Sequence, residues 1–309
     1  MTDFVYDLPR ILRLRALERD LARQSDARLQ PLAPLPARPA AIGVLSGSFN
    51  PLTHGHEALA AAAQREGLDA VLLLLPLRAV DKEGVTRASA LDRALVLTAW
   101  AERHPGVGVS MVNRGLYVEH AHLLAASYPA SRVVFLVGHD KIVQIFDPRY
   151  YADRDAALRD LFGYSTLRVA PRQDQGHAAL RALLDRAENH AYAPGVAGLA
   201  VNSDVAALSS TVVREAARAG TPWEDLVPPE AVRFVHEARP YAPPLRGSDG
   251  AEIDAYGLRL ALIEAIADGR AGFPPDPSPD IFAALYGAAC SDTSEGRRLR
   301  ARLATNSSS

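Results

Sequence analysis

The stretch Ala41-Ile-Gly-Val-Leu-Ser-Gly-Ser-Phe-Asn-Pro-Leu-Thr-His-Gly-His56 decides the fold of this chain. Its apolar start predicts a buried strand, and the alanine-rich run at 57–65, which lacks proline and glycine, predicts the helix that follows. His54 and His56 therefore lie at a predicted helix N-terminus, where unpaired backbone N–H groups and the helix dipole favour an anion. The stretch predicts a phosphate site between a strand and a helix.

Strand-like and helix-like segments alternate beyond this stretch. Further strands are predicted near residues 69–75, 107–112, 132–137, 165–170 and 197–202, with helical runs between them. Such alternation favours βαβ crossovers and a parallel sheet covered by helices on both faces. We therefore expect an α/β, Rossmann-like, doubly wound fold.

Three segments are expected along the chain. A helical arm (about Pro9 to Leu29) and a proline-rich linker occupy residues 1–40, and the α/β domain occupies residues 41–240. Residues 241–309 form a small helical extension with a disordered polar tail from Thr305. The sequence assigns no function to the arm or the extension.

Composition excludes several classes of partner. A formal net charge of −2 gives no general attraction to nucleic acid or to an anionic membrane, so phosphate binding should be local. Cys290 is the only cysteine, which excludes an internal disulfide and suits a reducing compartment. No signal-peptide pattern or membrane-length apolar run is present, so we expect a cytoplasmic protein. The sequence leaves open whether it forms a homo-oligomer.

A second polar cluster, Leu208-Ser-Ser-Thr-Val-Val-Arg214, opens another predicted helix. Hydroxyl groups in a first turn can cap the helix or bind phosphate oxygens. Arg214 lies about one turn further and can reach the same anion.

Both stretches resemble signatures of the nucleotidylyltransferase superfamily. The first resembles G-x-F-x-P-x-H-x-G-H, and its matching residues are Gly47, Phe49, Pro51, His54, Gly55 and His56. The second resembles I-S-S-T-x-x-R, with Leu208 in place of isoleucine. The resemblance implies transfer of a nucleoside monophosphate from a nucleoside triphosphate to an acceptor that carries a phosphate.

The resemblance also implies roles for the matching residues. His54 and His56 would hold the triphosphate and stabilise the pentacoordinate phosphorus, with Arg214 as the third catalytic residue. The other residues expected to bind ATP or the acceptor in these stretches are Gly47, Ser48, Phe49, Gly55, Ser209, Ser210 and Thr211. Mg2+ is the expected cofactor. It would bridge phosphate oxygens mostly through water and substrate, so no metal site built from side chains is predicted.

The segment that follows the strand predicted at 132–137 resembles one branch of this superfamily, the nicotinamide and nicotinate mononucleotide adenylyltransferases. Within that branch it is most similar to the divergent fungal-type enzymes and their bacterial relatives. Gly138 and Asp140 are similar to a glycine and an aspartate that contact the nucleotide in those enzymes. Tyr150 or Tyr151 stands where they carry a tryptophan that stacks on the pyridine ring. A tyrosine ring can also stack on an aromatic cation.

Three basic residues follow other strand ends. Lys82 and Arg172 are further candidates for substrate binding, and Arg93 lies on the next predicted helix. In open α/β sheets, ligands lie beyond the carboxyl ends of the strands, so this placement suits a role in the site. Surface charge is the alternative explanation for all three.

The resemblance implies an adenylyltransferase that joins AMP from ATP to nicotinamide or nicotinate mononucleotide, giving NAD or its deamido form and pyrophosphate. Its partners would be ATP and a pyridine mononucleotide. Two alternatives stay open: a nucleotidylyltransferase for pantetheine phosphate or a polyol phosphate, and a catalytically silent nucleotide-binding regulator. The cluster Glu119-His-Ala-His122 does not favour a metal site, because adjacent residues of a helix point in different directions.

Overall fold

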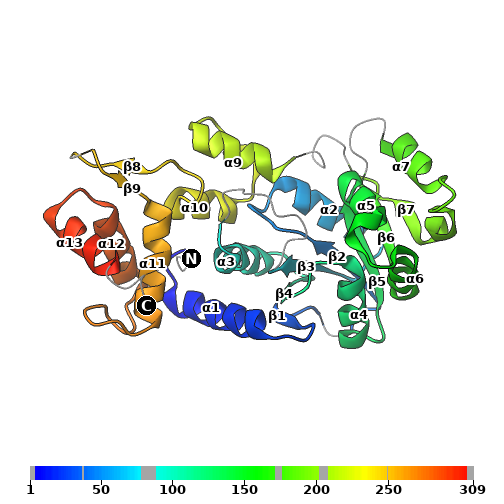
Figure 1. Ribbon diagram of the computed structural model, residues 1–309, viewed down its shortest axis with the longest axis horizontal. Helices are drawn as coiled ribbons and strands as arrows, with labels where there is room; N and C mark the ends of the chain where they lie inside the picture. The colour runs from blue at the N-terminus through cyan, green and yellow to red at the C-terminus, as the bar shows by residue number, and fades with distance from the viewer. Residues whose placement is uncertain are drawn as a thin grey trace.

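The computed structural model describes residues 4–36, 38–77, 88–170, 176–201, 208–248 and 250–304. A central sheet carries helices on both of its faces, and a group of C-terminal helices extends the molecule at one end (Figure 1). The predicted Rossmann-like α/β fold is confirmed.

Seven strands form the main sheet in the described part of the chain. In their order across the sheet they are β1 (Leu29–Ala33), β4 (Val107–Val112), β3 (Ala70–Pro76), β2 (Ala41–Ser46), β5 (Arg132–Gly138), β6 (Ser165–Ala170) and β7 (Val196–Gly198). The edge strand β1 runs antiparallel to β4, and every other pair is parallel. The chain moves outward from β2 through β3 to β4 and then returns to the other side of β2. The strand order therefore reverses between β2 and β5.

Alternate residues of the strands enter two separate hydrophobic clusters. In β3, Leu73 and Leu75 belong to one cluster, whereas Leu72 and Leu74 belong to the other, and all four are fully buried. A strand buried on both faces needs a continuous apolar run, which explains why its sequence shows no polar alternation.

Two layers of helices cover these faces. The first cluster receives residues from α1 (Leu8–Arg23), α2 (His54–Arg65), α3 (Ala90–Ala101), α9 (Ser210–Ala219) and α10 (Pro229–Ala238). The second receives residues from α4 (Tyr117–Ser127), α5 (His139–Phe146), α6 (Arg154–Tyr164), α7 (Gly176–Leu184) and the 3-10 turn η2 (His190–Gly195). Two further 3-10 turns are η1 (Pro148–Tyr150) and η3 (Glu224–Leu226).

The N-terminal arm differs from the prediction. Its helix ends at Arg23 rather than near Leu29, and part of the predicted linker forms strand β1. The side chain of Asn113 holds the turn between them, since its Nδ2 donates to the carbonyl of Asp26 at 2.8 Å and its Oδ1 accepts from the N–H of Arg28 at 2.8 Å. Pro31 is tolerated because an edge strand leaves one side of its backbone unpaired. Arg28 and Asn113 are 85 positions apart, so the local sequence around Arg28 could not predict this turn.

The C-terminal residues form α11 (Ala255–Ala267), α12 (Pro279–Cys290), α13 (Ser294–Ala304) and a small hairpin of β8 (Leu245–Arg246) and β9 (Glu252–Ile253). The helical character of this segment was predicted, and the hairpin was not. The predicted tail from Thr305 lies outside the described residues. Strand β7 covers only the start of the strand predicted at 197–202.

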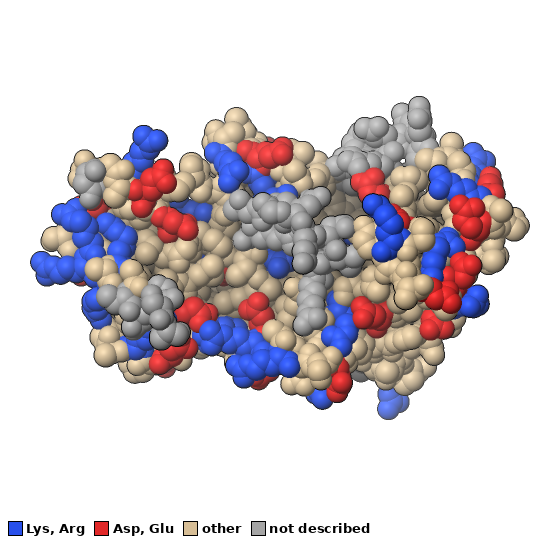
Figure 2. Space-filling model, viewed as in Figure 1, with Lys and Arg blue, Asp and Glu red and all other residues tan. Residues whose placement is uncertain are grey.

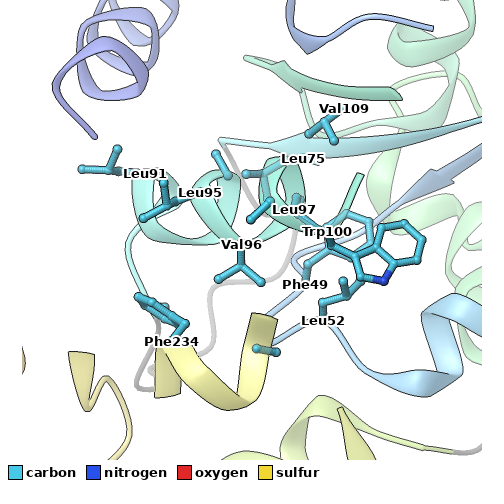
Figure 3. Close-up of a cluster of buried hydrophobic side chains, with 14 of the residues drawn as sticks. Phe49, Leu52, Leu75, Leu91, Leu95, Val96, Leu97, Trp100, Val109 and Phe234 are labelled. Atoms are coloured by element: carbon cyan, nitrogen blue, oxygen red, sulfur yellow. The ribbon is translucent and has the colours of Figure 1, made fainter. Parts of the chain in front are cut away.

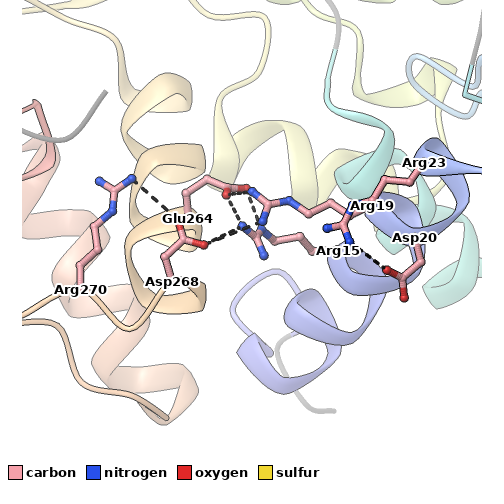
Figure 4. A network of polar contacts seen from close by, with 7 residues as sticks. All are labelled: Arg15, Arg19, Asp20, Arg23, Glu264, Asp268 and Arg270. Atoms are coloured by element: carbon pink, nitrogen blue, oxygen red, sulfur yellow. Dashed lines mark hydrogen bonds and ion pairs between the residues drawn. The ribbon is translucent and has the colours of Figure 1, made fainter. Parts of the chain in front are cut away.

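An ion-pair network joins α11 to α1 (Figure 4). Arg15 donates to Glu264 from Nε at 2.7 Å and lies 3.3 Å from Asp268 through Nη2, and Arg19 also pairs with Glu264. The hydrogen bond from Arg15 lowers the pKa of Glu264. Helix α1 of the N-terminal arm is thus held against helix α11 of the C-terminal segment.

Candidate active site

The loop of residues 47–53, here called the signature loop, follows the carboxyl end of β2 at the point where strand order reverses. This is where ligands bind in open α/β sheets. The side chains of Phe49 and Leu52 point into the hydrophobic cluster around α3, near Trp100 (Figure 3). Both are almost fully buried. Phe49 therefore acts in this structure as a packing residue that fixes the loop.

Backbone N–H groups of the loop differ in their availability. The N–H of Gly47 donates to the carbonyl of Leu74 at 3.1 Å and so continues the sheet. Ser48 and Phe49 show no hydrogen bond from their N–H groups to any described residue. Phe49 has a φ of 46°, in the left-handed region that side chains other than glycine rarely adopt. Of these three backbone N–H groups, only that of Gly47 therefore has a hydrogen-bond partner in the described part of the chain.

His56 lies in the first turn of α2 with a defined tautomer. Its Nδ1 accepts from the N–H of Thr53 at 3.0 Å, in a capping box that closes the helix start. The proton of the neutral ring therefore sits on Nε2, which makes no hydrogen bond to a described residue. Burial lowers the pKa of His56 to about 4. At neutral pH this side chain offers an uncharged N–H donor.

His54 makes a different contact. Its Nδ1 forms a hydrogen bond with the carboxylate of Glu57, three residues later on α2. The same carboxylate accepts from Nε1 of Trp100. Glu57 was not predicted as a site residue, although the three-residue spacing on a helix would have placed it beside His54. The carboxylate orients the His54 ring and fixes the proton on Nδ1.

The two signatures meet in space. On α9, Ser210 donates from Oγ to the carbonyl of Pro51 at 2.8 Å, and Nη1 of Arg214 donates to the carbonyl of Asn50 at 2.8 Å. Nη2 of Arg214 also donates to Oγ1 of Thr211 at 3.1 Å. Ser209 caps the helix by accepting from the N–H of Thr211 at 3.1 Å. The N-terminus of α9 thus packs on the signature loop.

Residues that follow β5 line the other side of the reversal point. Gly138 is the N-cap of α5, and a Cβ added to it would meet no atom within 4 Å. Asp140 is exposed in the first turn of that helix. The hydroxyl of Tyr151 donates to the carbonyl of Ile145 at 2.8 Å, and burial raises its pKa to about 12. This hydrogen bond fixes the side chain of Tyr151.

Tyr117 and His120 were not predicted to belong to the site. Tyr117 donates to the carbonyl of Ser46 at 3.2 Å, and Nε2 of His120 lies 3.0 Å from the carbonyl of Arg114. Burial lowers the pKa of His120 and raises that of Tyr117, and the nearby Tyr151 also raises the pKa of Tyr117. Their placement depends on where α4 packs, which the local sequence does not show.

Arg93 and Asn50 hold the signature loop from within. Nη1 of Arg93 donates to the carbonyl of Ser48 at 2.7 Å. Oδ1 of Asn50 accepts from the N–H of Ala88 at 3.0 Å and from the hydroxyl of Tyr241 at 2.9 Å. Arg93 is buried, so it is not a surface charge. Lys82 and Arg172 lie outside the described residues.

Charge on the molecular surface is mixed. Basic and acidic side chains are interspersed over the described part of the face shown in Figure 2. No helix among the described residues is long and apolar enough to cross a membrane. In the same residues, no three His, Cys, Asp or Glu side chains are grouped to hold a metal ion. His122 pairs instead with Asp160 at 3.6 Å.

The chain belongs to the cytidylyltransferase-like family, which matches residues 44–216. This segment contains both signatures, the end of β2 and the whole of β5. The chain is therefore a nucleotidyltransferase. The names of its sequence relatives point to one kind of nucleotidyltransferase.

A protein of Gloeobacter violaceus named "Probable nicotinate-nucleotide adenylyltransferase" is 28% identical over 212 residues, covering 66% of this chain and 97% of that protein. A protein of the same name from Corynebacterium kroppenstedtii is 28% identical over 208 residues, covering 65% of this chain and 91% of its own. The nicotinic acid mononucleotide adenylyltransferase of Plasmodium falciparum, solved with NaAD, is similar with a TM-score of 0.48 at 14% identity, covering 65% of this chain and 97% of that one. The assignment to this class rests on the family match and the sequence relatives, and not on the structural similarity. This chain is thus related to the nicotinate-nucleotide adenylyltransferases.

Proposed function

We propose that the protein transfers the adenylyl group of ATP to a pyridine mononucleotide, with nicotinate mononucleotide ahead of nicotinamide mononucleotide. The observation that carries this proposal is the contact between the two signatures, through Arg214 and Ser210 on the backbone of Asn50 and Pro51. This contact brings Arg214 and the start of α9 onto the loop that leads from β2 to His54 and His56. The names of the sequence relatives support the pyridine acceptor and rank nicotinate first.

The reaction needs no covalent intermediate. A phosphate oxygen of the mononucleotide attacks the α-phosphorus of ATP, and the bond from that phosphorus to the bridging oxygen of pyrophosphate breaks. The electron pair of the broken bond leaves with pyrophosphate, and the new bond joins the two nucleotides. Because the nucleophile is already an anion, the protein mainly has to position the reactants and stabilise charge.

Each residue of the site has a task in this scheme. The Nε2–H of His56 donates to a triphosphate oxygen, and His54, oriented by Glu57, contacts the phosphorus being transferred. Arg214 and the hydroxyl groups at the start of α9 bind the β- and γ-phosphates, and the free N–H groups of Ser48 and Phe49 receive the acceptor phosphate. Mg2+ enters with ATP as part of the substrate, coordinated by phosphate oxygens and water.

Release of pyrophosphate by the purified protein tests this proposal. The donors are ATP and CTP, each with Mg2+, and the acceptors are nicotinate mononucleotide, nicotinamide mononucleotide, pantetheine phosphate and glycerol phosphate. We expect release only with ATP and a pyridine mononucleotide, and loss of release in a His54→Ala variant. Release with another acceptor alone would assign a different transferase, and nucleotide binding without release would assign a regulator.

A further inference from the structure

Residues 241–248 and 250–304, here called the C-terminal extension, lie beyond the segment matched by the family. The extension packs against α1 in Figure 1 and shares the hydrophobic cluster that includes β3 and α3. Its helix α11 contributes Leu262, Ile263 and Ile266 to that cluster. The extension is therefore part of the same packed body as the active site.

A buried polar group connects the extension to the start of α3. Nη2 of Arg259 lies 3.1 Å from Oδ1 of Asp92, and neither side chain is exposed to solvent. The hydroxyl of Tyr256 donates to Oδ2 of Asp92 at 2.7 Å and accepts from the N–H of Ser89 at 2.7 Å. Ser89 is the N-cap of α3. The extension thus binds the first turn of this helix through one fully buried ion pair and two partly buried hydrogen bonds.

The same turn holds the signature loop. From the next position, Arg93 donates to the carbonyl of Ser48 at 2.7 Å and, through Nε, to the carbonyl of Ala88 at 3.0 Å. The N–H of Ala88 in turn donates to the side chain of Asn50. Any shift of the first turn of α3 would therefore move the loop between Ser48 and Asn50.

A second, direct contact runs from the extension to the loop. The hydroxyl of Tyr241 donates to Oδ1 of Asn50 at 2.9 Å, and both side chains are almost fully buried. The backbone of Asn50 also receives Arg214 from α9. Asn50 therefore joins the extension, α3 and the second signature at one point.

We propose that the C-terminal extension positions the signature loop for phosphate binding, with Tyr241 and Tyr256 as its positioning residues. The inference rests on the proposed function in taking this loop as the site of ATP. Neither tyrosine touches the substrate in this scheme. Each sets the place of backbone groups that do, and a displacement of about 1 Å in such groups can lower a rate about 100-fold.

The test compares three full-length variants that each lose one hydroxyl: Tyr241→Phe, Tyr256→Phe and, as the matched control, Tyr286→Phe. Tyr286 lies in α12 of the same extension, is buried like Tyr241, and donates to the carbonyl of Ala238 at 3.1 Å rather than to α3 or the signature loop. Thermal unfolding of each variant sets a temperature at which all are folded. At that temperature we measure the affinity for α,β-methylene ATP by calorimetry, and kcat and KM for pyrophosphate release.

We expect Tyr241→Phe and Tyr256→Phe to weaken binding of the ATP analogue about 10-fold and to lower kcat/KM at least as much, while Tyr286→Phe stays within twofold of the unmodified protein. If all three variants lose stability but bind the analogue equally well, the extension only stabilises the fold and the proposal is wrong. The calorimetric measurement of ATP-analogue binding does not depend on which acceptor the protein uses. An unmodified protein that binds the analogue but releases no pyrophosphate would refute the proposed function alone.

Discussion

Nη1 of Arg214 donates a 2.8 Å hydrogen bond to the backbone carbonyl of Asn50, across 164 positions of sequence. This bond joins the start of α9 to the turn that precedes α2. It places the guanidinium at the edge of the predicted triphosphate site. The signature loop thus fixes the position of the Arg214 side chain, and Arg214 in turn holds the backbone of that loop at Asn50.

Replacement of Arg214 should show both parts of this relationship. An Arg214→Ala variant should lower kcat/KM about 100-fold, since it removes a charged donor from the phosphates. Arg214→Lys should recover only part of the loss, because an ammonium lacks the planar pair of N–H groups with which a guanidinium binds a phosphate. Arg218→Ala, one turn further on the exposed face of α9, is the control. Steady-state kinetics would contradict the account if Arg214→Ala kept activity within threefold of the unmodified protein.

The carboxylate of Glu57 should matter for rate more than for substrate affinity. A Glu57→Gln variant weakens the contact that orients His54, and we expect kcat to fall about 10- to 100-fold with little change in the KM for ATP. Trp100 provides an independent readout, because its Nε1 donates to the same carboxylate. In a Trp223→Phe background, its emission should shift on the Glu57→Gln substitution. Unchanged kcat together with shifted emission would show that Glu57 does not orient a catalytic group.

The neutral state of His56 predicts a pH dependence of stability. The pKa of His56 is about 4 in the folded protein, against an ordinary value of 6.5. Between these values the unfolded chain binds a proton that the folded protein does not, so the free energy of unfolding is highest above pH 6.5 and falls as the pH approaches 4. Between pH 7 and pH 5 the unmodified protein should lose about 2 kcal/mol more than a His56→Gln variant, as measured by urea unfolding. Equal losses would mean that His56 titrates normally.

The buried pair of Asp92 and Arg259 makes a separate prediction about stability. Removing one member leaves the other charge buried and unpaired, which costs about 3–5 kcal/mol in general. An Asp92→Ala variant should therefore lower the free energy of unfolding by about this amount, measured by urea titration. The double variant Asp92→Leu, Arg259→Met should recover most of the loss. A loss below about 1 kcal/mol in the single variant would show that the pair is solvated.

The local sequence predicted the strands, which depend on the pattern of apolar residues, and the phosphate site, which depends on the spacing of residues within the two signatures. The strands at 107–112 and 165–170 were predicted with the bounds found in the structure, and the two signatures were predicted to share a site. Strand β1 was missed because Pro31 resembles a linker residue, and its partner in β4 is remote in sequence. Asn50 and Tyr241 were missed because their contacts join residues remote in sequence. Glu57 was missed although its spacing from His54 on the predicted helix was visible in the sequence.

Transfer of label from ATP carrying 32P at the α-position tests the central claim most directly. With nicotinate mononucleotide and Mg2+, the unmodified protein should convert the label into a dinucleotide of the expected mass while releasing unlabelled pyrophosphate. A His54→Ala, His56→Ala variant should leave the label in ATP. Label that stays in ATP with the unmodified protein, or that appears only as AMP, would contradict adenylyl transfer to a pyridine mononucleotide.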